Sequence, residues 1–104
     1  MIHGQRSNIL RLLYFNQSDF SSEINQAISE IRTITELSEK SMNSIIDLLQ
    51  QIDIAVKSDN KEAQTEAKFT LKGMLKGIGN TGVKVISVLS GLANLAKFFG
   101  FPIS

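Results

Sequence analysis

Six residues in the C-terminal half of the chain have the spacing of a nucleotide-binding loop. The run Gly77-Ile78-Gly79-Asn80-Thr81-Gly82 spells G-x-G-x-x-G, which holds a pyrophosphate when it follows a β-strand, opens a helix and precedes an acidic residue by about 20 positions. Here the preceding residues read as a lysine-bearing helix, and no acid follows Glu66. A phosphate-binding P-loop also fails, because Val83 stands where its lysine belongs. We therefore expect Gly77, Gly79 and Gly82 to form a joint or hinge between helical segments.

The chain offers few groups for catalysis or metal binding. His3 is the single histidine and falls in an expected loose terminus, so a Ser-His or metal-His arrangement has no second element to work with. There is no cysteine, which excludes a thiolate zinc site and a disulfide. The acids Glu36, Glu39, Asp47 and Asp53 are expected on solvated helix faces, where no spacing singles out a catalytic pair. We predict a protein that is not an enzyme and that has no cofactor, metal or small-molecule substrate.

Charge is distributed unevenly along the chain. The net charge is only +1, yet residues 17–66 contain all ten acids, and residues 67–104 contain five lysines and no acid. Two explanations stay open: attraction between antiparallel helices, or contact of the basic end with an anionic partner such as lipid. Nucleic acid is not expected, because the pI near 8.0 is low and neither a helix-turn-helix spacing nor an aromatic platform is visible.

Apolar residues recur at intervals of three and four along most of the chain, which predicts amphipathic helices. The first helix is expected from a cap at Ser18 or Asp19. Its apolar stripe thins over residues 35–44 and then resumes. The sequence leaves open whether this is one long helix or two helices with a break near residue 40.

The segment Ser58-Asp59-Asn60 is the clearest boundary between helices. Asp59, with Glu62 three residues later, resembles a capping box. We expect a turn there and a further helix from about Lys61 to the glycines at 77–82.

Residues 82–101 are expected to form one apolar C-terminal helix that stops at Gly100 and Pro102. From Gly82 to Phe99 it would span roughly 27 Å, short of a bilayer core of about 30 Å, so we do not expect a permanent membrane span. The helix is either central to a bundle, or cationic and amphipathic, entering an anionic membrane or a partner. The residues expected to face such a partner or membrane are Lys72, Lys76, Lys84, Val85, Val88, Leu92, Leu95, Lys97, Phe98 and Phe99.

The predicted fold is all-α, a single domain over residues 1–104 built as a mostly antiparallel bundle of three to five helices. Residues 1–16 form a poorly defined N-terminal segment, with a short helix favoured over residues 8–15. The predicted core consists of Ile24, Ile28, Ile31, Ile45, Leu49, Ile52, Leu71, Leu75, Ile78, Val85, Leu89, Leu92 and Phe99.

A region from about residue 45 to residue 100, which contains LLQQIDIAVKSDNKEAQTEAKFTLKGMLKGIGNTGVKVISVLSGLANLAKFFG, resembles a helical tail of bacterial multidomain and conflict-system proteins. The shared pattern is an acidic helix, a short Asp/Asn turn, and a helix pair rich in small and apolar residues that ends in Gly. The chain departs from it by carrying a short N-terminal segment in place of a partner domain. The resemblance implies a bacterial origin and an accessory role in defence or toxicity.

These observations predict a helical interaction or assembly module that binds itself or a partner helical protein. The alternative is a membrane-active effector that disrupts anionic lipid through its cationic C-terminal helix. We expect a cytoplasmic protein with no cleavable signal, or one peripheral to the inner membrane if the alternative holds.

Overall fold

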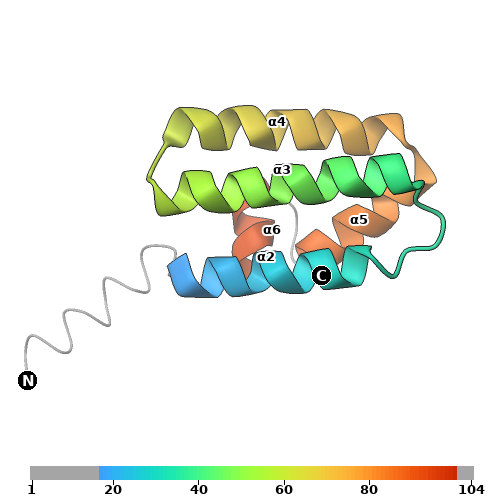
Figure 1. Cartoon of the computed structure of the whole chain (residues 1–104), viewed down its shortest axis with the longest axis horizontal. Helices are drawn as coiled ribbons and strands as arrows, with labels where there is room; N and C mark the ends of the chain where they lie inside the picture. Colours follow the sequence, from blue (N-terminus) through green and yellow to red (C-terminus); the bar gives the residue numbers. More distant parts are fainter. Residues whose placement is uncertain (1–16, 101–104) are drawn as a thin grey trace, which may run out of the picture.

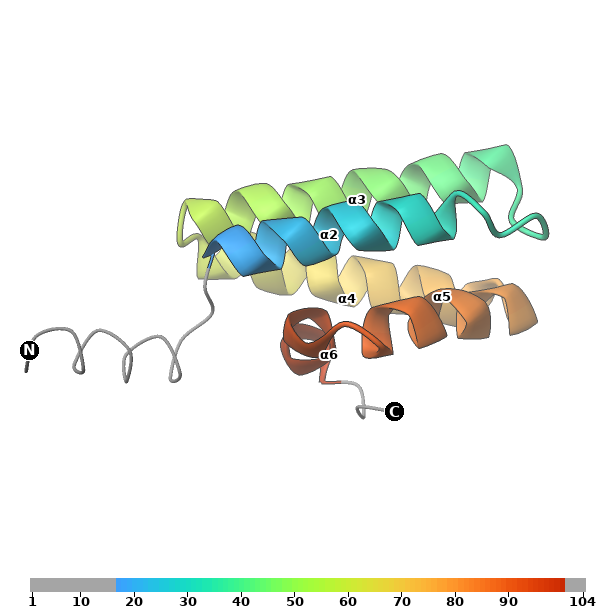
Figure 2. The same cartoon turned by 90° about the horizontal axis from the view of Figure 1, so that it is seen from below.

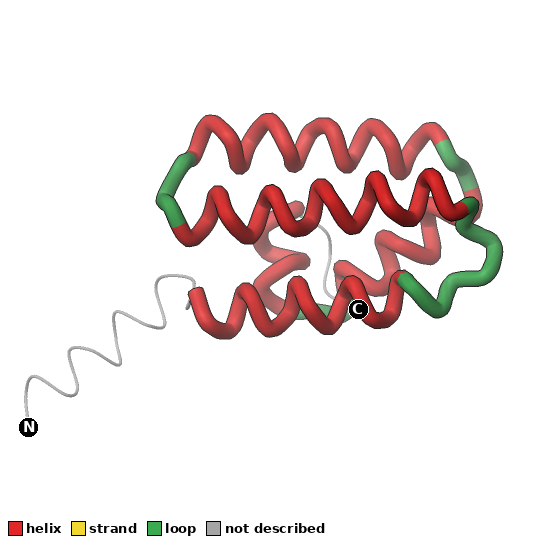
Figure 3. Tube along the Cα trace, in the orientation of Figure 1, coloured by secondary structure: helices red, strands yellow, loops and turns green. Residues whose placement is uncertain are grey.

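The computed structural model describes residues 17–100, which form five helices (Figure 1). These are α2 (Gln17–Ile31), α3 (Glu39–Lys57), α4 (Lys61–Gly77), α5 (Asn80–Ser90) and α6 (Ala93–Phe99). Residues 17–100 contain helices and loops and no strand (Figure 3), so the predicted all-α bundle is confirmed. The predicted segment 1–16, its helix over 8–15, and the stop at Pro102 lie outside the described residues.

The first three of these helices lie side by side and alternate in direction (Figure 1). α3 packs against both α2 and α4. The chain then returns through α5 and α6, which pack against each other and against α2 (Figure 2). α6 lies crosswise to the long helices (Figure 1), so it closes one side of the bundle.

One hydrophobic core connects all five helices. Every predicted core residue is buried except Ile78, which is half-buried and packs against the core. Phe20 of α2 and Phe99 of α6 are the two largest fully enclosed side chains. Burial of a side chain of this size stabilises a fold by about 1.5–3 kcal/mol, so α6 contributes directly to the stability of the bundle.

The question left open over residues 35–44 is settled in favour of two helices, separated by residues 32–38. The Ser38 hydroxyl accepts a hydrogen bond from the Ser41 N–H at 3.1 Å and caps α3. Leu37 is buried, which anchors the connection to the core. A side-chain cap and a buried leucine therefore provide the break that no Gly or Pro marks.

The turn between α3 and α4 lies where the sequence predicts it, but its capping residue is different. Asp59 has a φ of 53°, and the N–H groups of Asp59 and Asn60 donate to the carbonyls of Val56 and Ala55, the pattern of a Schellman motif. Asn60 caps α4, because its side chain accepts from the Ala63 N–H at 3.0 Å. The expectation that Asp59 caps α4 is wrong, since Asp59 occupies the left-handed position that ends α3.

The prediction of one helix over residues 82–101 is also wrong. α5 begins at Asn80 and ends at Ser90, and α6 begins at Ala93 after Leu92 adopts an extended conformation. The bend turns α6 across α2 and puts Leu95 and Phe99 in the same core as α5. The stop at Gly100 is confirmed, because Gly100 takes a φ of 78° after α6.

Candidate functional site

The glycines at 77–82 join α4 to α5, and they do so by two different means. Gly79 has a φ of 68°, a conformation that L side chains rarely adopt. Gly82 is buried, and a Cβ there would lie 2.0 Å from the Leu75 carbonyl oxygen. Gly77 has neither constraint. The expected joint is therefore present as a tightly packed turn, and whether it moves as a hinge stays a prediction.

A carboxylate from α2 caps α6. Glu23 Oε1 accepts hydrogen bonds from the N–H groups of Asn94 at 2.9 Å and Leu95 at 3.2 Å, and Glu23 Oε2 accepts from Asn94 Nδ2 at 2.8 Å. Leu92 occupies the N-cap position of α6 and provides no side-chain cap. Glu23 thus satisfies helix-terminal donors that the local sequence leaves without acceptors, and its charge lies at the favourable end of the helix dipole.

The structure divides the predicted partner-facing residues between the core and the surface. Four of them are buried: Val85, Leu92, Leu95 and Phe99. Val88 and Phe98 are half-buried against the core. The expectation that a partner or a membrane is faced is therefore wrong in the folded bundle for the four buried side chains, because a helix that is apolar on most sides is used to fill a core. For Val88 and Phe98 it stays a prediction.

Two of the predicted lysines do come together, at a surface groove between α4 and α5. The groove has a volume of about 520 Å³ and is lined by Phe69, Lys72, Gly73, Leu75, Lys76 and Ile86; we call it the α4–α5 groove. Its volume falls within the range of ligand-sized pockets. Lys84, Lys97, Val88 and Phe98 do not line it.

Phe69 is the most prominent apolar side chain beside the α4–α5 groove. It is 64% exposed, although it lies in the middle of a helix that packs on the core. Lys68 Nζ lies 5.9 Å from the Phe69 ring centroid and 5.4 Å from that of Phe98, within cation–π range of both rings. The groove therefore presents an aromatic side chain within a positively charged surface.

Gly73 lies inside α4, four residues before the helix ends. Beyond the backbone of its own helix, a Cβ at this position would meet no atom of residues 17–100 within 4 Å, and the backbone does not have a positive φ. A glycine inside a helix costs about 0.5–1 kcal/mol relative to alanine. The described part of the chain contains no packing contact that offsets this cost.

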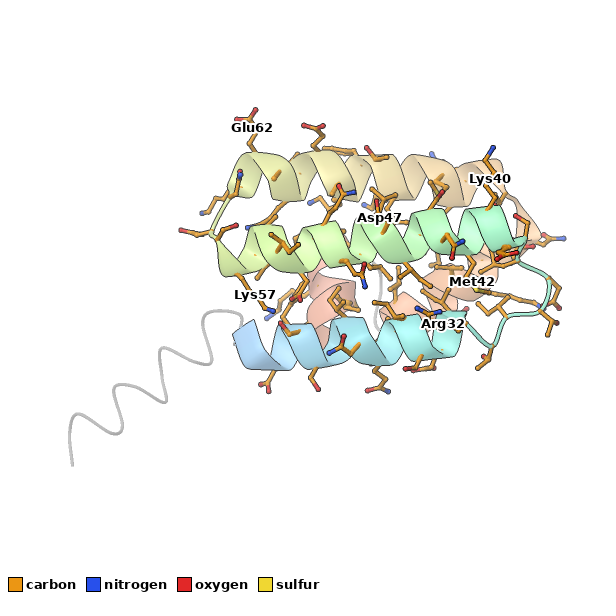
Figure 4. All side chains as sticks on the ribbon, in the orientation of Figure 1. Arg32, Lys40, Met42, Asp47, Lys57 and Glu62 are labelled. Atoms are coloured by element: carbon orange, nitrogen blue, oxygen red, sulfur yellow. The ribbon has the colours of Figure 1, made fainter. Side chains whose placement is uncertain are left out.

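Apart from Lys61 at its first position, the acidic residues of α4 precede its basic residues along the helix. Glu62 projects away from the bundle near the start of α4 (Figure 4), and Glu66 is exposed one turn later. Lys68, Lys72 and Lys76 follow at intervals of four, which places them along one side of the helix. The lysine-bearing half of α4 is the half that lines the α4–α5 groove.

Lys84 is engaged elsewhere. Its Nζ forms a salt bridge with Glu36 in the connection between α2 and α3. The hydrogen bond from Lys84 and the nearby positive charge lower the pKa of Glu36 below its ordinary value of 4.5. This contact pairs a lysine of the basic C-terminal region with an acid of the central region inside the fold, but it joins α5 to a loop and not to another helix.

The sequence analysis assigned no site role to Phe69, Ile86 or Glu23. Phe69 and Gly73 fall off the apolar stripe of α4, and this departure from the periodicity was the available signal for the groove. Glu23 gave no local signal, because its partners are 71 and 72 positions away along the chain.

Residues 17–100 contain neither a membrane-spanning helix nor a candidate metal site. None of the helices in residues 17–100 combines the length and the hydropathy needed to cross a bilayer. The same residues contain no cluster of three or more histidine or acidic side chains placed to hold a metal ion.

Comparisons with known proteins identify no relative. No protein-family model, curated protein or solved structure matches the chain.

Proposed function

We propose that this chain is a non-enzymatic interaction module that binds a partner protein through the α4–α5 groove. The observation that carries the proposal is the exposure of Phe69 beside an apolar hollow that Lys72 and Lys76 border. Aromatic side chains that fill or border a pocket account for much of the binding energy of many protein interfaces. Phe69 supplies such an anchor on the surface of a packed helix.

The position of the groove favours binding without rearrangement. α4 and α5 are both fixed to the core, through Leu71 and Leu75 of α4 and through Val85 and Leu89 of α5. A partner that contacts Phe69 and Ile86 therefore meets side chains on helices that are already ordered. Less conformational entropy is lost on binding to such a surface than on binding to a loop.

The resemblance of residues 45–100 to helical tails of bacterial conflict-system proteins supports a bacterial, accessory role in defence or toxicity. This part of the proposal depends on the sequence pattern alone. The groove lies within the resembling region, so the two arguments concern the same helices.

A peptide-display selection on the full chain tests the proposal. Peptides enriched on the wild type would be measured by fluorescence anisotropy against Phe69→Asp and, as a matched control, Ile54→Asp. Ile54 is 65% exposed but lies on α3, so its substitution changes an equally exposed apolar residue outside the groove. We expect Phe69→Asp to abolish binding and Ile54→Asp to leave it unchanged. A selection whose best peptides bind all three proteins equally, or which enriches no peptide, contradicts the proposal.

The membrane-active alternative predicts a different behaviour. It would require α5 or α6 to leave the bundle and expose side chains such as Leu95 and Phe99, which are almost completely buried. Leakage from anionic vesicles, compared between the wild type and a variant with Lys72, Lys76, Lys84 and Lys97 changed to Glu, measures this activity. Charge-dependent leakage by the wild type would favour the alternative over a protein-binding module.

A further inference from the structure

The α4–α5 groove has the geometry of a site for a helix. On the α4 side it is lined by the buried Leu75 and by four more exposed residues, Phe69, Lys72, Gly73 and Lys76. These four are residues i, i+3, i+4 and i+7 of one helix. Four residues at this spacing form the hole that receives a side chain of a facing helix in knobs-into-holes packing. The groove therefore fits a side chain that projects from a second helix lying across α4.

Gly73 is the corner of this hole that a partner would approach most closely. Neither a positive φ nor a neighbouring atom of the described chain accounts for a glycine there. A glycine on a helix surface allows another backbone to approach within a distance that a Cβ would prevent. A facing helix that crosses α4 at Gly73 would use the space that residues 17–100 leave empty beside this glycine.

The charge around the hole specifies the chemistry of that helix. Lys72 and Lys76 form two of its corners, Lys68 lies one turn before Lys72 on the same side, and residues 67–104 contain no acid. Acidic side chains that flank the inserted apolar residue would complement this surface, and basic ones would be repelled. We infer that the partner is an acidic amphipathic helix whose apolar stripe crosses α4 at Gly73, with Phe69 and Ile86 on either side of the inserted side chain.

Other occupants fit less well. Two copies paired groove to groove would set Lys72 and Lys76 against the same lysines, and a flat lipid surface would leave the hollow beside Gly73 unfilled. The inference rests on the proposed function, because it names the class of partner for the same groove.

The test uses two display libraries on one helical peptide scaffold, with the same randomised apolar stripe and with flanking positions fixed as Glu in one and Lys in the other. Both are selected on the full chain, and individual peptides are then measured by fluorescence anisotropy. We expect binders from the Glu-flanked library, and we expect Lys72→Glu together with Lys76→Glu to reverse the preference.

The decisive variant is Gly73→Ala, with Gly77→Ala as its matched control. Gly77 lies in the same helix, also has open space around it, and does not line the groove. Gly73→Ala should weaken peptide binding by about tenfold or more, because a methyl group fills the close contact. It should also raise the denaturant midpoint of unfolding, because alanine favours a helix. Loss of binding with a gain of stability cannot be ascribed to misfolding.

The outcomes separate the inference from the proposed function. Two results would refute the acidic helix as the partner and would still agree with an interaction module. In the first, Phe69-dependent peptides come equally from the Lys-flanked library. In the second, the peptides bind Gly73→Ala as tightly as the wild type. Libraries that yield no Phe69-dependent binder overturn both. Sedimentation velocity and vesicle flotation of the wild type complete the test, since self-association or lipid binding that Lys72→Glu removes would identify a second copy or an anionic membrane as the occupant instead.

Discussion

The cap that Glu23 provides to α6 predicts that this half-buried acid contributes much of the stability of the C-terminal region. Glu23→Ala removes the acceptors of three hydrogen bonds, from the N–H groups of Asn94 and Leu95 and from Asn94 Nδ2. Loss of an N-cap costs about 0.5–2 kcal/mol, and hydrogen bonds to a charged group contribute about 1.5–3 kcal/mol each. Because the site is only partly buried, we expect the free energy of unfolding to fall by about 2–3 kcal/mol in total.

The assay is equilibrium unfolding in urea and thermal unfolding followed by circular dichroism. A loss of this size lowers the melting temperature of a domain of about 100 residues by roughly 10–20 °C. Hydrogen exchange at the amides of Asn94 and Leu95 should also accelerate in Glu23→Ala, since both lose their acceptor. Glu23→Gln keeps one acceptor oxygen without the charge, so its loss should be intermediate.

Glu30→Ala is the matched control for this prediction. Glu30 lies on the same helix, is exposed, and accepts from Gln26 Nε2 within α2. Its replacement should change the free energy of unfolding by no more than about 0.5 kcal/mol. Equal effects of Glu23→Ala and Glu30→Ala would refute the reasoning, because the contact with α6 would then contribute no stability of its own.

Three other substitutions test separate features of the fold. Gly82→Ala should destabilise the protein by about 3 kcal/mol or more in urea unfolding, because its Cβ would overlap the Leu75 backbone; an unchanged midpoint would contradict the close packing. Asp59→Gly should raise the free energy of unfolding by about 0.5–1 kcal/mol, because glycine adopts the left-handed conformation without strain, and a loss of stability would refute this. The folded-state pKa of Glu36 is lowered, so its pairing with Lys84 stabilises the fold above pH 4.5 and is lost as the pH falls through the lowered pKa. The difference in urea midpoint between wild type and Glu36→Gln should therefore shrink below pH 4.5. A difference that grows as the pH falls would contradict this prediction.

The helices and most of the core could be predicted because they depend on local periodicity. The recurrence of Ile24, Ile28 and Ile31, and later of Leu71 and Leu75, identifies the buried side of each helix without knowledge of its neighbours. Most of the turns were predicted to within a few residues for the same reason. What remained uncertain was which of two adjacent polar residues caps a helix, as with Asp59 and Asn60.

The break at Gly91–Leu92 could not be predicted from the sequence, because its cause is tertiary. The apolar stripe continues through these residues, and the acceptors that replace the lost helix hydrogen bonds come from Glu23 in α2. The same limit applies to the candidate site. Its lysines were identified by their charge, but the groove exists only because α5 returns beside α4 and brings Ile86 near Gly73.

The C-terminal third therefore contains two surfaces with different roles, and this distinction bears on the choice between the two functions. Its inner side, which includes Leu95 and Phe99, completes the core and is held by Glu23. Its outer side, around Phe69 and Gly73, is open in the folded state. A membrane-active mechanism must expose the inner side, which would break the packing of a buried cluster and remove the charged cap of α6. Binding at the α4–α5 groove displaces no core residue. A folded domain has a free energy of unfolding of only about 5–15 kcal/mol, and release of α6 would cost a large part of this free energy. A partner can bind at the α4–α5 groove without releasing α6.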